Sequence, residues 1–333
     1  MSKKRILLHV GTHKTGSTTL QSTMYRNREA LEKVGVSYLG AQGTYPHLYS
    51  AFMNRPLDFV WNQHSGLGEA QIRARDLGVK QALRTELSQA TGDTIILSSE
   101  FLSKLERNEL KALYGFLSDY GSVHVVYFYR ELLSWISSDS QQLAKAGLRS
   151  RPTAFATGME RLYEYPIKIH DVFAKTGCTF IRFEDAIETG ICNTFLARFD
   201  LPTLASLGLK EQRLNESISG NAVQAMYLYN HLFPRGSETR NVREVKRLCQ
   251  LPGDKYQVLG LRPKQIEEYR LKRDEVTKTL GLKLSAADEL PKSQSLDPLS
   301  AETLKMVDRY TAKHLANSAK GWRYWRSLIW RAR

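Results

Sequence analysis

Cysteine is scarce in this sequence. Only Cys178, Cys192 and Cys249 occur among 333 residues, and their spacing matches no metal-ligand pattern. The odd count and the absence of a paired arrangement favour a reducing compartment over a disulfide framework. Hydrophobic residues make up 42% of the chain, so a sizeable core can form without such cross-links.

Long hydrophobic runs are also missing. No stretch approaches the roughly 20 apolar residues of a membrane-spanning helix. The apolar run that follows Lys3, Lys4 and Arg5 is too short for the core of a signal peptide. We therefore expect a soluble protein of the cytoplasm.

Acidic residues are outnumbered by basic ones, because 34 Asp and Glu stand against 48 Lys and Arg and give a formal net charge of +14. Such an excess favours polyanionic partners, such as nucleotides, nucleic acids, acidic glycans or anionic lipid headgroups. The sequence has no helix-turn-helix, zinc-finger or RNP signature. We therefore expect neither a nucleic-acid partner nor a metal.

The most informative stretch is residues 5–21, RILLHVGTHKTGSTTLQ. Residues 6–10 have the length and composition of a buried strand, Gly11 breaks it, and Ser17 opens a helix that reaches about Val34. A loop between a strand and a helix N-terminus turns its backbone N–H groups inward, at the positive end of the helix dipole. The pattern predicts a site for an anionic nucleotide.

The loop lacks the lysine of a nucleoside triphosphatase. In the pattern G-x-x-x-x-G-K-[ST], the lysine after the second glycine reaches the β and γ phosphates. Ser17 occupies that position, and the only lysine in the loop is Lys14. We therefore expect a shorter or different phosphate group.

Residues 14–20, KTGSTTL, match without a gap the pattern K-[TS]-G-[ST]-[ST]-x-L. This pattern is the 5′-phosphosulfate loop of sulfotransferases that use 3′-phosphoadenosine 5′-phosphosulfate (PAPS), and the sequence resembles that family. The resemblance implies PAPS as sulfuryl donor, adenosine 3′,5′-bisphosphate (PAP) as product nucleotide, and no metal. Lys14 would neutralise the charge on the leaving oxygen. The donor-binding residues implied in this loop are Thr12, His13, Lys14, Thr15, Gly16, Ser17, Thr18 and Thr19.

A second segment extends the resemblance. Residues 123–129 are predicted to form a strand, and Arg130 stands at its carboxyl end. Ser138 follows Arg130 by eight residues. The family's 3′-phosphate site has an arginine and a serine at this spacing, and a phosphate monoester favours a guanidinium plus a hydroxyl donor. The alternative is an arginine paired with Glu131 or Asp139. The proline found two positions after this arginine in many relatives is missing.

Two residues are candidates for the base that takes the acceptor's proton. His47 lies after the first helix and the next strand, where the family often has His or Glu, and a histidine titrates near neutral pH. Its alternative is a histidine with only local hydrogen bonds. Glu100 ends a predicted strand at residues 94–100, at the edge of a parallel sheet where ligands bind. Its alternative is the N-cap network of the next helix.

Strands and helices alternate as far as about residue 200. This alternation, together with the resemblance, predicts an α/β fold with a three-layer core of P-loop type and a mostly parallel sheet. We expect residues 1–200 to form the nucleotide-binding core. Residues 201–333 are expected to form a mainly helical C-terminal extension packed on the same domain.

The C-terminal part contributes weaker candidates. By resemblance Arg213 would add to the 3′-phosphate site, although a surface charge is the alternative. Residues 321–331 mix tryptophans with arginines, which suits a helix docked on the domain or lying on an anionic membrane surface.

The acceptor is expected to be anionic or to contain carbohydrate, such as a glycan or glycolipid. Two other functions remain open, a nucleotide-dependent kinase or related transferase, and a polyanion-binding module without catalysis.

Overall fold

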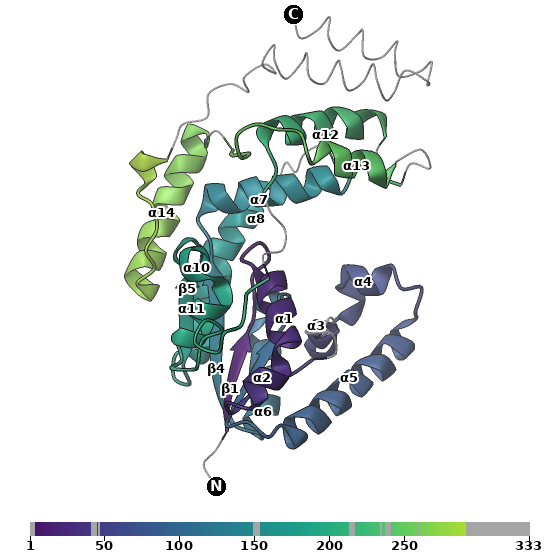
Figure 1. Cartoon of the computed structure of the whole chain (residues 1–333), viewed down its shortest axis with the longest axis vertical. Coiled ribbons are helices and arrows are strands. Elements are labelled where there is room, and N and C mark those ends of the chain that lie inside the picture. The colour runs from purple at the N-terminus through teal and green to yellow at the C-terminus, as the bar shows by residue number, and fades with distance from the viewer. Residues whose placement is uncertain are drawn as a thin grey trace, which may run out of the picture. The chain divides into compact units, whose positions relative to one another are not determined.

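The computed structural model describes residues 4–40, 45, 47–148, 154–212, 217–233, 235–236, 241–258 and 260–290 (Figure 1). They form two compact units that interleave along the sequence. The first consists of the described residues within Met1–Glu131, Met159–Leu214 and Lys272–Leu284, and the second of those within Leu132–Gly158, Asn215–Leu271 and Ser285–Arg333.

A five-stranded sheet forms the centre of the first unit. Its strands are β1 (Arg5–His9), β2 (Val36–Tyr38), β3 (Thr94–Ser98), β4 (Ser122–Tyr129) and β5 (Cys178–Arg182). Their order is β2-β3-β1-β4-β5, and every pairing is parallel. Ile6, Leu7 and Leu8 are all fully buried, because helices cover both faces of a parallel sheet and leave no polar side for alternation.

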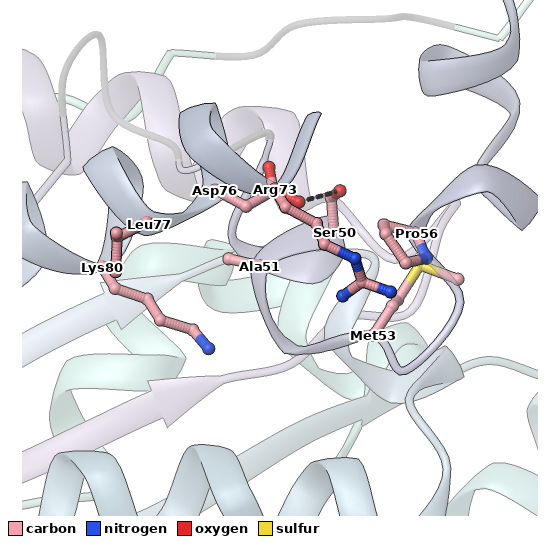
Figure 2. Close-up of a pocket in the computed structure, with 8 residues that line it drawn as sticks. All are labelled: Ser50, Ala51, Met53, Pro56, Arg73, Asp76, Leu77 and Lys80. Atoms are coloured by element: carbon pink, nitrogen blue, oxygen red, sulfur yellow. Dashed lines mark hydrogen bonds between the residues drawn. The ribbon is translucent and has the colours of Figure 1, made fainter. Parts of the chain in front are cut away.

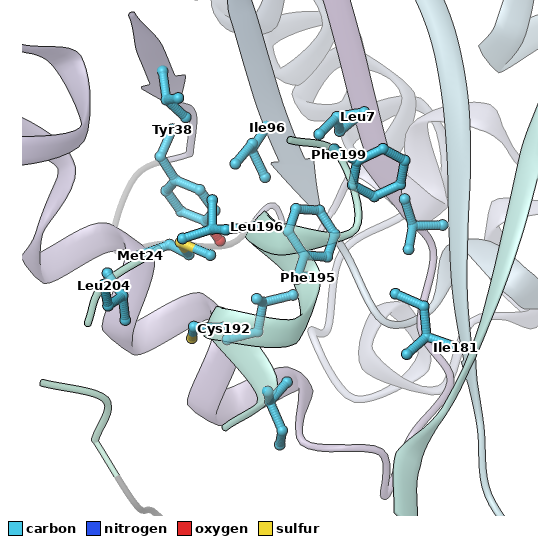
Figure 3. Packing of buried hydrophobic residues seen from close by; sticks show 14 of the residues in the cluster. Leu7, Met24, Tyr38, Ile96, Ile181, Cys192, Phe195, Leu196, Phe199 and Leu204 are labelled. Atoms are coloured by element: carbon cyan, nitrogen blue, oxygen red, sulfur yellow. The ribbon is translucent and has the colours of Figure 1, made fainter. Parts of the chain in front are cut away.

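One face of the sheet is covered by α1 (Ser17–Arg26), α2 (Arg28–Glu32), α10 (Phe183–Thr189) and α11 (Ile191–Ala197). Figure 3 shows the core on this face, where Leu7 and Ile96 of the sheet pack with Met24 of α1 and Phe195 and Leu196 of α11. Burial of a side chain of this size stabilises the fold by roughly 1.5–3 kcal/mol.

The single helix predicted from Ser17 to about Val34 is wrong in one respect, because the helix breaks at Asn27. The Asn27 side chain donates a hydrogen bond to the carbonyl of Thr23 at 2.8 Å. Asn27 is both the C-cap of α1 and the N-cap of α2. A side chain that bonds the preceding turn competes with continued helix, which is typical of asparagine.

The opposite face is covered by α6 (Arg107–Ser118) and α9 (Tyr165–Phe173), which pack on each other and on β4. Leu110, Leu113 and Leu117 of α6 are fully buried. The layers of helices, sheet and helices confirm the predicted α/β fold.

The connections of the first unit add one long helix and several short helices and turns. They are α3 (Leu48–Phe52), the 3-10 turn η2 (Pro56–Asp58), α4 (Val60–Gln63), the long α5 (Glu69–Gln89), the 3-10 turn η3 (Leu102–Lys104) and the π-helical turn η4 (Glu160–Glu164). Buried Asn62 donates to the Ser50 hydroxyl and to the Pro56 carbonyl, both at 2.7 Å. These bonds fasten α4 to α3.

The second unit is helical. Its elements include α7 (Leu132–Lys145), most of α8 (Ala154–Met159), α12 (Gly220–Leu232), α13 (Val242–Leu248), the first half of α14 (Pro263–Leu280) and the 3-10 turn η5 (Ala287–Glu289). Ala144, Val223, Met226, Tyr229 and Leu248 form its core. Of the helices within the described ranges, none has the length and apolar character needed to cross a membrane.

Candidate active site

The strand order brings two predicted segments together. From β1 the chain continues to β2 and β3 on one side, and β4 and β5 then lie on the other side. The order therefore reverses between β1 and β4, and open parallel sheets bind ligands beyond the carboxyl ends of the strands at such a reversal. The glycine loop follows β1, and Arg130 follows β4.

The loop is closed on the carbonyl of Thr12. The hydroxyls of Thr15 and Ser17 both donate to this oxygen, the latter at 3.2 Å. Gly16 has φ 79 and is the N-cap of α1, where it supplies no side-chain cap. The N–H groups of the first helical turn are thus left without a capping side chain at the positive end of the helix dipole.

The side chains of the loop differ in exposure. His13 and Lys14 are half-buried and Thr18 is exposed, so solvent reaches these three. Lys14 has φ 68, a conformation that costs a non-glycine residue strain and is found at ligand sites. The hydroxyls of the buried Thr15 and Ser17 are used within the loop. The buried loop residues are Thr12, Thr15, Ser17 and Thr19.

Arg130 lies against the loop. One guanidinium nitrogen, Nη1, donates to the Lys14 carbonyl at 2.7 Å. The guanidinium carbon lies 4.4 Å from the centre of the Phe183 ring, and a Cβ placed on Gly16 would lie 3.4 Å from that ring. Burial lowers the pKa of Arg130 to about 10, although the charge of Glu184 opposes this shift. A half-buried cation therefore lies beside the loop.

Acidic side chains next to Arg130 also contact a second arginine, Arg182. The Glu131 carboxylate lies 2.9 Å from Arg182 Nη2, and Asp185 lies 3.1 Å from Arg182 Nη1. The backbone N–H of Glu131 donates to the Glu184 carboxylate at 3.2 Å. This network fixes the turn that follows β4.

Glu100 enters the site from β3, the other neighbour of β1. Its Oε2 atom lies 3.0 Å from His13 Nδ1. Burial alone would raise the pKa of Glu100, but the hydrogen bond and charge of His13, together with Lys14 and His9, hold it below its usual value. A Cβ on Gly11 would lie 2.5 Å from the Glu100 carbonyl oxygen, so the loop and the end of β3 touch directly.

His47 immediately precedes α3. Its ring packs edge-on against Trp61, with 6.4 Å between the ring centres. The Trp61 ring in turn packs against Phe101, with 5.3 Å between the ring centres. Burial and the charge of Arg75 lower the pKa of His47, which Asp76 partly opposes. Its Nδ1 atom is buried and has no hydrogen-bond partner among the residues that the structure describes.

Ser138 lies in α7, which belongs to the second unit, so its pairing with Arg130 stays a prediction. Arg213 and residues 321–331 lie outside the described residues. Within the described part of the chain, no group of three or more His, Cys, Asp or Glu side chains is arranged to hold a metal ion.

A hollow of about 180 Å³ lies beside α3 and α5 (Figure 2). Its charged groups have partners, because Asp76 accepts from the Ser50 hydroxyl at 2.5 Å and Arg73 lies 2.6 Å from Glu69. The predicted site residues are not among the residues that line it, which are Ser50, Ala51, Met53, Pro56, Arg73, Asp76, Leu77 and Lys80. We therefore treat it as separate from the loop.

Sequence reasoning missed two aromatic residues of the site. Phe183 lies under the Arg130 guanidinium, and Phe101 packs edge-on against His13 at 4.6 Å. Phe183 directly follows β5, and Phe101 directly follows Glu100. That placement is the only signal in the sequence that could have suggested them.

The parallel sheet, the glycine loop and the reversal of strand order define an α/β protein of P-loop type. Three solved structures that it resembles are sulfotransferases or sulfotransferase domains. One, from Alicyclobacillus acidocaldarius, is 12% identical, with 87% of this chain and 100% of that chain covered and a TM-score of 0.43. The sulfotransferase domain of the Synechococcus PCC 7002 olefin synthase is 11% identical, with 85% and 97% covered and a TM-score of 0.41.

The sulfotransferase domain from the curacin biosynthetic pathway is 16% identical, with 86% of this chain and 99% of that chain covered and a TM-score of 0.39. No protein-family model matches the sequence, and no curated protein matches it.

Proposed function

We propose that this protein transfers the sulfuryl group of PAPS to a hydroxyl or amine of an acceptor and releases PAP. One observation carries the proposal. The loop with the sequence KTGSTTL, which lacks the triphosphate-binding lysine, lies at the strand-order reversal with the Arg130 guanidinium bonded to its backbone at 2.7 Å. This arrangement supports recognition of a nucleotide with anionic groups at two ends.

The loop fits the 5′ end of such a donor. The first-turn N–H groups of α1 carry no side-chain cap, and a helix N-terminus of this kind favours anionic oxygens. Thr18 adds an exposed hydroxyl and Lys14 a half-buried cation. The hydroxyls of Thr15 and Ser17 hold the loop in shape through Thr12.

Arg130 fits a 3′-phosphate, because a guanidinium is a rigid donor matched to phosphate oxygens. Ser138 and Arg213 complete the set of residues proposed for that phosphate. PAPS would supply a sulfuryl group bonded to its 5′-phosphate, and that phosphate would be the leaving group. Lys14 would stabilise the negative charge of that leaving group, and preorganised charge of this kind is usually the largest catalytic contribution.

The acceptor's proton requires a base, for which the sequence offers His47 and Glu100. We propose a glycan or glycolipid as acceptor, and the net charge of +14 supports an acidic one. The reaction is proposed to take place in the cytoplasm.

A thermal-shift comparison tests the proposal, since a ligand that binds the native state raises its melting temperature. PAP, ATP with magnesium, and AMP are compared at equal concentration and at raised salt. We expect PAP to give the largest shift, and a chelator should leave that shift unchanged. A larger shift with ATP and magnesium would favour a kinase, and equal shifts for all anions would favour a polyanion-binding module.

A further inference from the structure

The contact between His13 and Glu100 has a chemical meaning beyond the binding of the donor. An ionised carboxylate accepts hydrogen bonds and cannot donate one. At 3.0 Å, His13 Nδ1 therefore donates its N–H to Glu100 Oε2. In a neutral imidazole, a proton on Nδ1 leaves the lone pair on Nε2. Glu100 thus selects the tautomer in which Nε2 is the basic atom.

The structure also holds the His13 ring in place. Phe101, the residue after Glu100, packs edge-on against the ring, with 4.6 Å between the ring centres and an angle of 82° between the ring planes. Glu100 itself is fixed, because its backbone touches Gly11 at the start of the same loop. The carboxylate, the aromatic ring and the histidine therefore come from two segments in direct contact, and a base oriented in this way needs little reorganisation.

On these grounds we propose that His13 is the residue that accepts the acceptor's proton, and that Glu100 is its positioning residue. This inference rests on the proposed sulfuryl transfer. In the step, the acceptor oxygen forms a bond to sulfur while its proton passes to His13 Nε2. The bond between sulfur and the bridging oxygen breaks, and its electron pair leaves on the 5′-phosphate of PAP, beside Lys14.

The two bases suggested by the sequence suit the role less well. The pKa of Glu100 lies below the usual carboxyl value, which makes it a weak base, and its oxygen is already engaged by His13. His47 has no hydrogen-bond partner for its buried Nδ1 within the described ranges, so no carboxylate there fixes the proton on that nitrogen. Its ring reaches the His13 ring indirectly, through contacts with Trp61 and Phe101.

The first measurement needs no acceptor. Nitrogen NMR of histidine-labelled protein reports which ring nitrogen carries the proton. We expect His13 to be the Nδ1-protonated tautomer at a pH at which the ring is neutral, and Glu100→Gln to abolish this preference while PAP still binds. An Nε2-protonated His13 in the wild-type protein would overturn the assignment. The His13 resonance is identified by its loss in His13→Gln.

The second measurement is release of PAP from PAPS in single turnovers with a glycan and glycolipid extract as acceptor. His13→Gln should lower the rate by about 10²–10⁴-fold, the range of general-base catalysis, with PAP affinity changed less than about threefold. Glu100→Gln should lower the rate by roughly 10–100-fold, because the base is present but no longer held. His64→Gln is the matched control, since His64 is exposed and its Nδ1 atom lies 2.7 Å from the nearby Val60 carbonyl oxygen.

The outcomes separate the two levels of the proposal. A His13→Gln variant with wild-type turnover would refute His13 as the base, and a large loss in His47→Gln alone would return the role to His47. Failure of the wild-type protein to bind PAP would instead refute the proposed function. Loss of PAP affinity in His13→Gln, with turnover lost only in proportion, would reduce His13 to a donor-binding residue.

Discussion

Replacing Arg130 with methionine separates a structural role from a ligand-binding one. Two contacts favour the native arginine. A hydrogen bond from a charged group, here to the Lys14 carbonyl at 2.7 Å, contributes about 1.5–3 kcal/mol. The guanidinium over Phe183 at 4.4 Å contributes about 0.5–2 kcal/mol. Together they stabilise the fold by about 2–5 kcal/mol.

Burial of the charge opposes these gains. The pKa of Arg130 falls from 12.5 to about 10 because burial disfavours the cation more than Glu184 favours it. At 1.36 kcal/mol per pKa unit, this burial costs about 3 kcal/mol. The two sides nearly cancel, so Arg130→Met should change the free energy of unfolding by no more than about 1–2 kcal/mol. A half-buried cation that contributes so little to stability is suited to an anionic ligand.

The assay is thermal denaturation with and without PAP. At 100 times its Kd, PAP should stabilise the wild-type protein by about 2.7 kcal/mol. If Arg130→Met weakens PAP binding about 100-fold, the same concentration should stabilise the variant by only about 0.4 kcal/mol. A variant that loses more than about 3 kcal/mol without ligand, yet keeps its PAP affinity, would show that Arg130 only braces the loop and would refute the reasoning.

The matched control is Arg28→Met. Arg28 makes the same pair of contacts, because its Nη1 donates to the Tyr25 carbonyl at 3.0 Å and its guanidinium carbon lies 4.5 Å from the Tyr25 ring. Its side chain is 43% exposed, so its charge remains solvated. We expect Arg28→Met to leave PAP stabilisation unchanged, and a loss equal to that of Arg130→Met would indicate a nonspecific effect of charge.

Three further predictions concern Lys14, His9 and Gly16. Lys14→Ala should lower turnover by about two or more orders of magnitude, the scale of a lost preorganised charge partner, and near-normal single-turnover rates would contradict its role. Burial lowers the pKa of His9 from 6.5 to about 4, so the unfolded chain binds this proton more readily. The stability it contributes is present above about pH 6.5 and is lost as the pH falls toward 4, by about 2–3 kcal/mol. Urea unfolding at pH 7 and 4.5 should show this loss in the wild-type protein and not in His9→Gln. Gly16→Ala should destabilise the protein more than Gly35→Ala, because both glycines have positive φ but only Gly16 faces Ile191 and Phe183. Equal urea midpoints for the two variants would show that Ile191 and Phe183 move aside at little cost.

The fold was predictable because its signals are local. The largely apolar run at residues 6–10 and the glycine that ends it identify a buried strand and a loop without reference to distant residues. The break at Asn27 was missed because an apolar stripe runs on through Leu31, and the periodicity of apolar residues does not report a side chain that bonds the preceding turn. Periodicity therefore predicts which face of a helix is buried better than where the helix ends.

The candidate site was predictable only in part. Spacing along one loop identifies Lys14 as a candidate, and the chain order of loop and arginine suggests Arg130. The partner of Glu100 was not predictable, because residues 13 and 100 meet only if β3 is the neighbour of β1. Strand order depends on how the whole sheet assembles. The expectation that Glu100 itself is a base came from its position alone, without the histidine that engages it.

The two glycines of the loop illustrate the same limit. From the sequence, each is explained by the need of a phosphate-binding backbone to turn tightly. In the structure, a side chain at Gly11 would collide with the backbone of Glu100, on the β3 side of the loop, whereas one at Gly16 would collide with Ile191 and approach Phe183, on the β5 side. The spacing of the glycines is therefore also required by two contacts on opposite sides of the loop. Those contacts set the positions of Glu100 beside His13 and of Phe183 beneath Arg130, so the motif constrains residues that lie far outside it in the sequence.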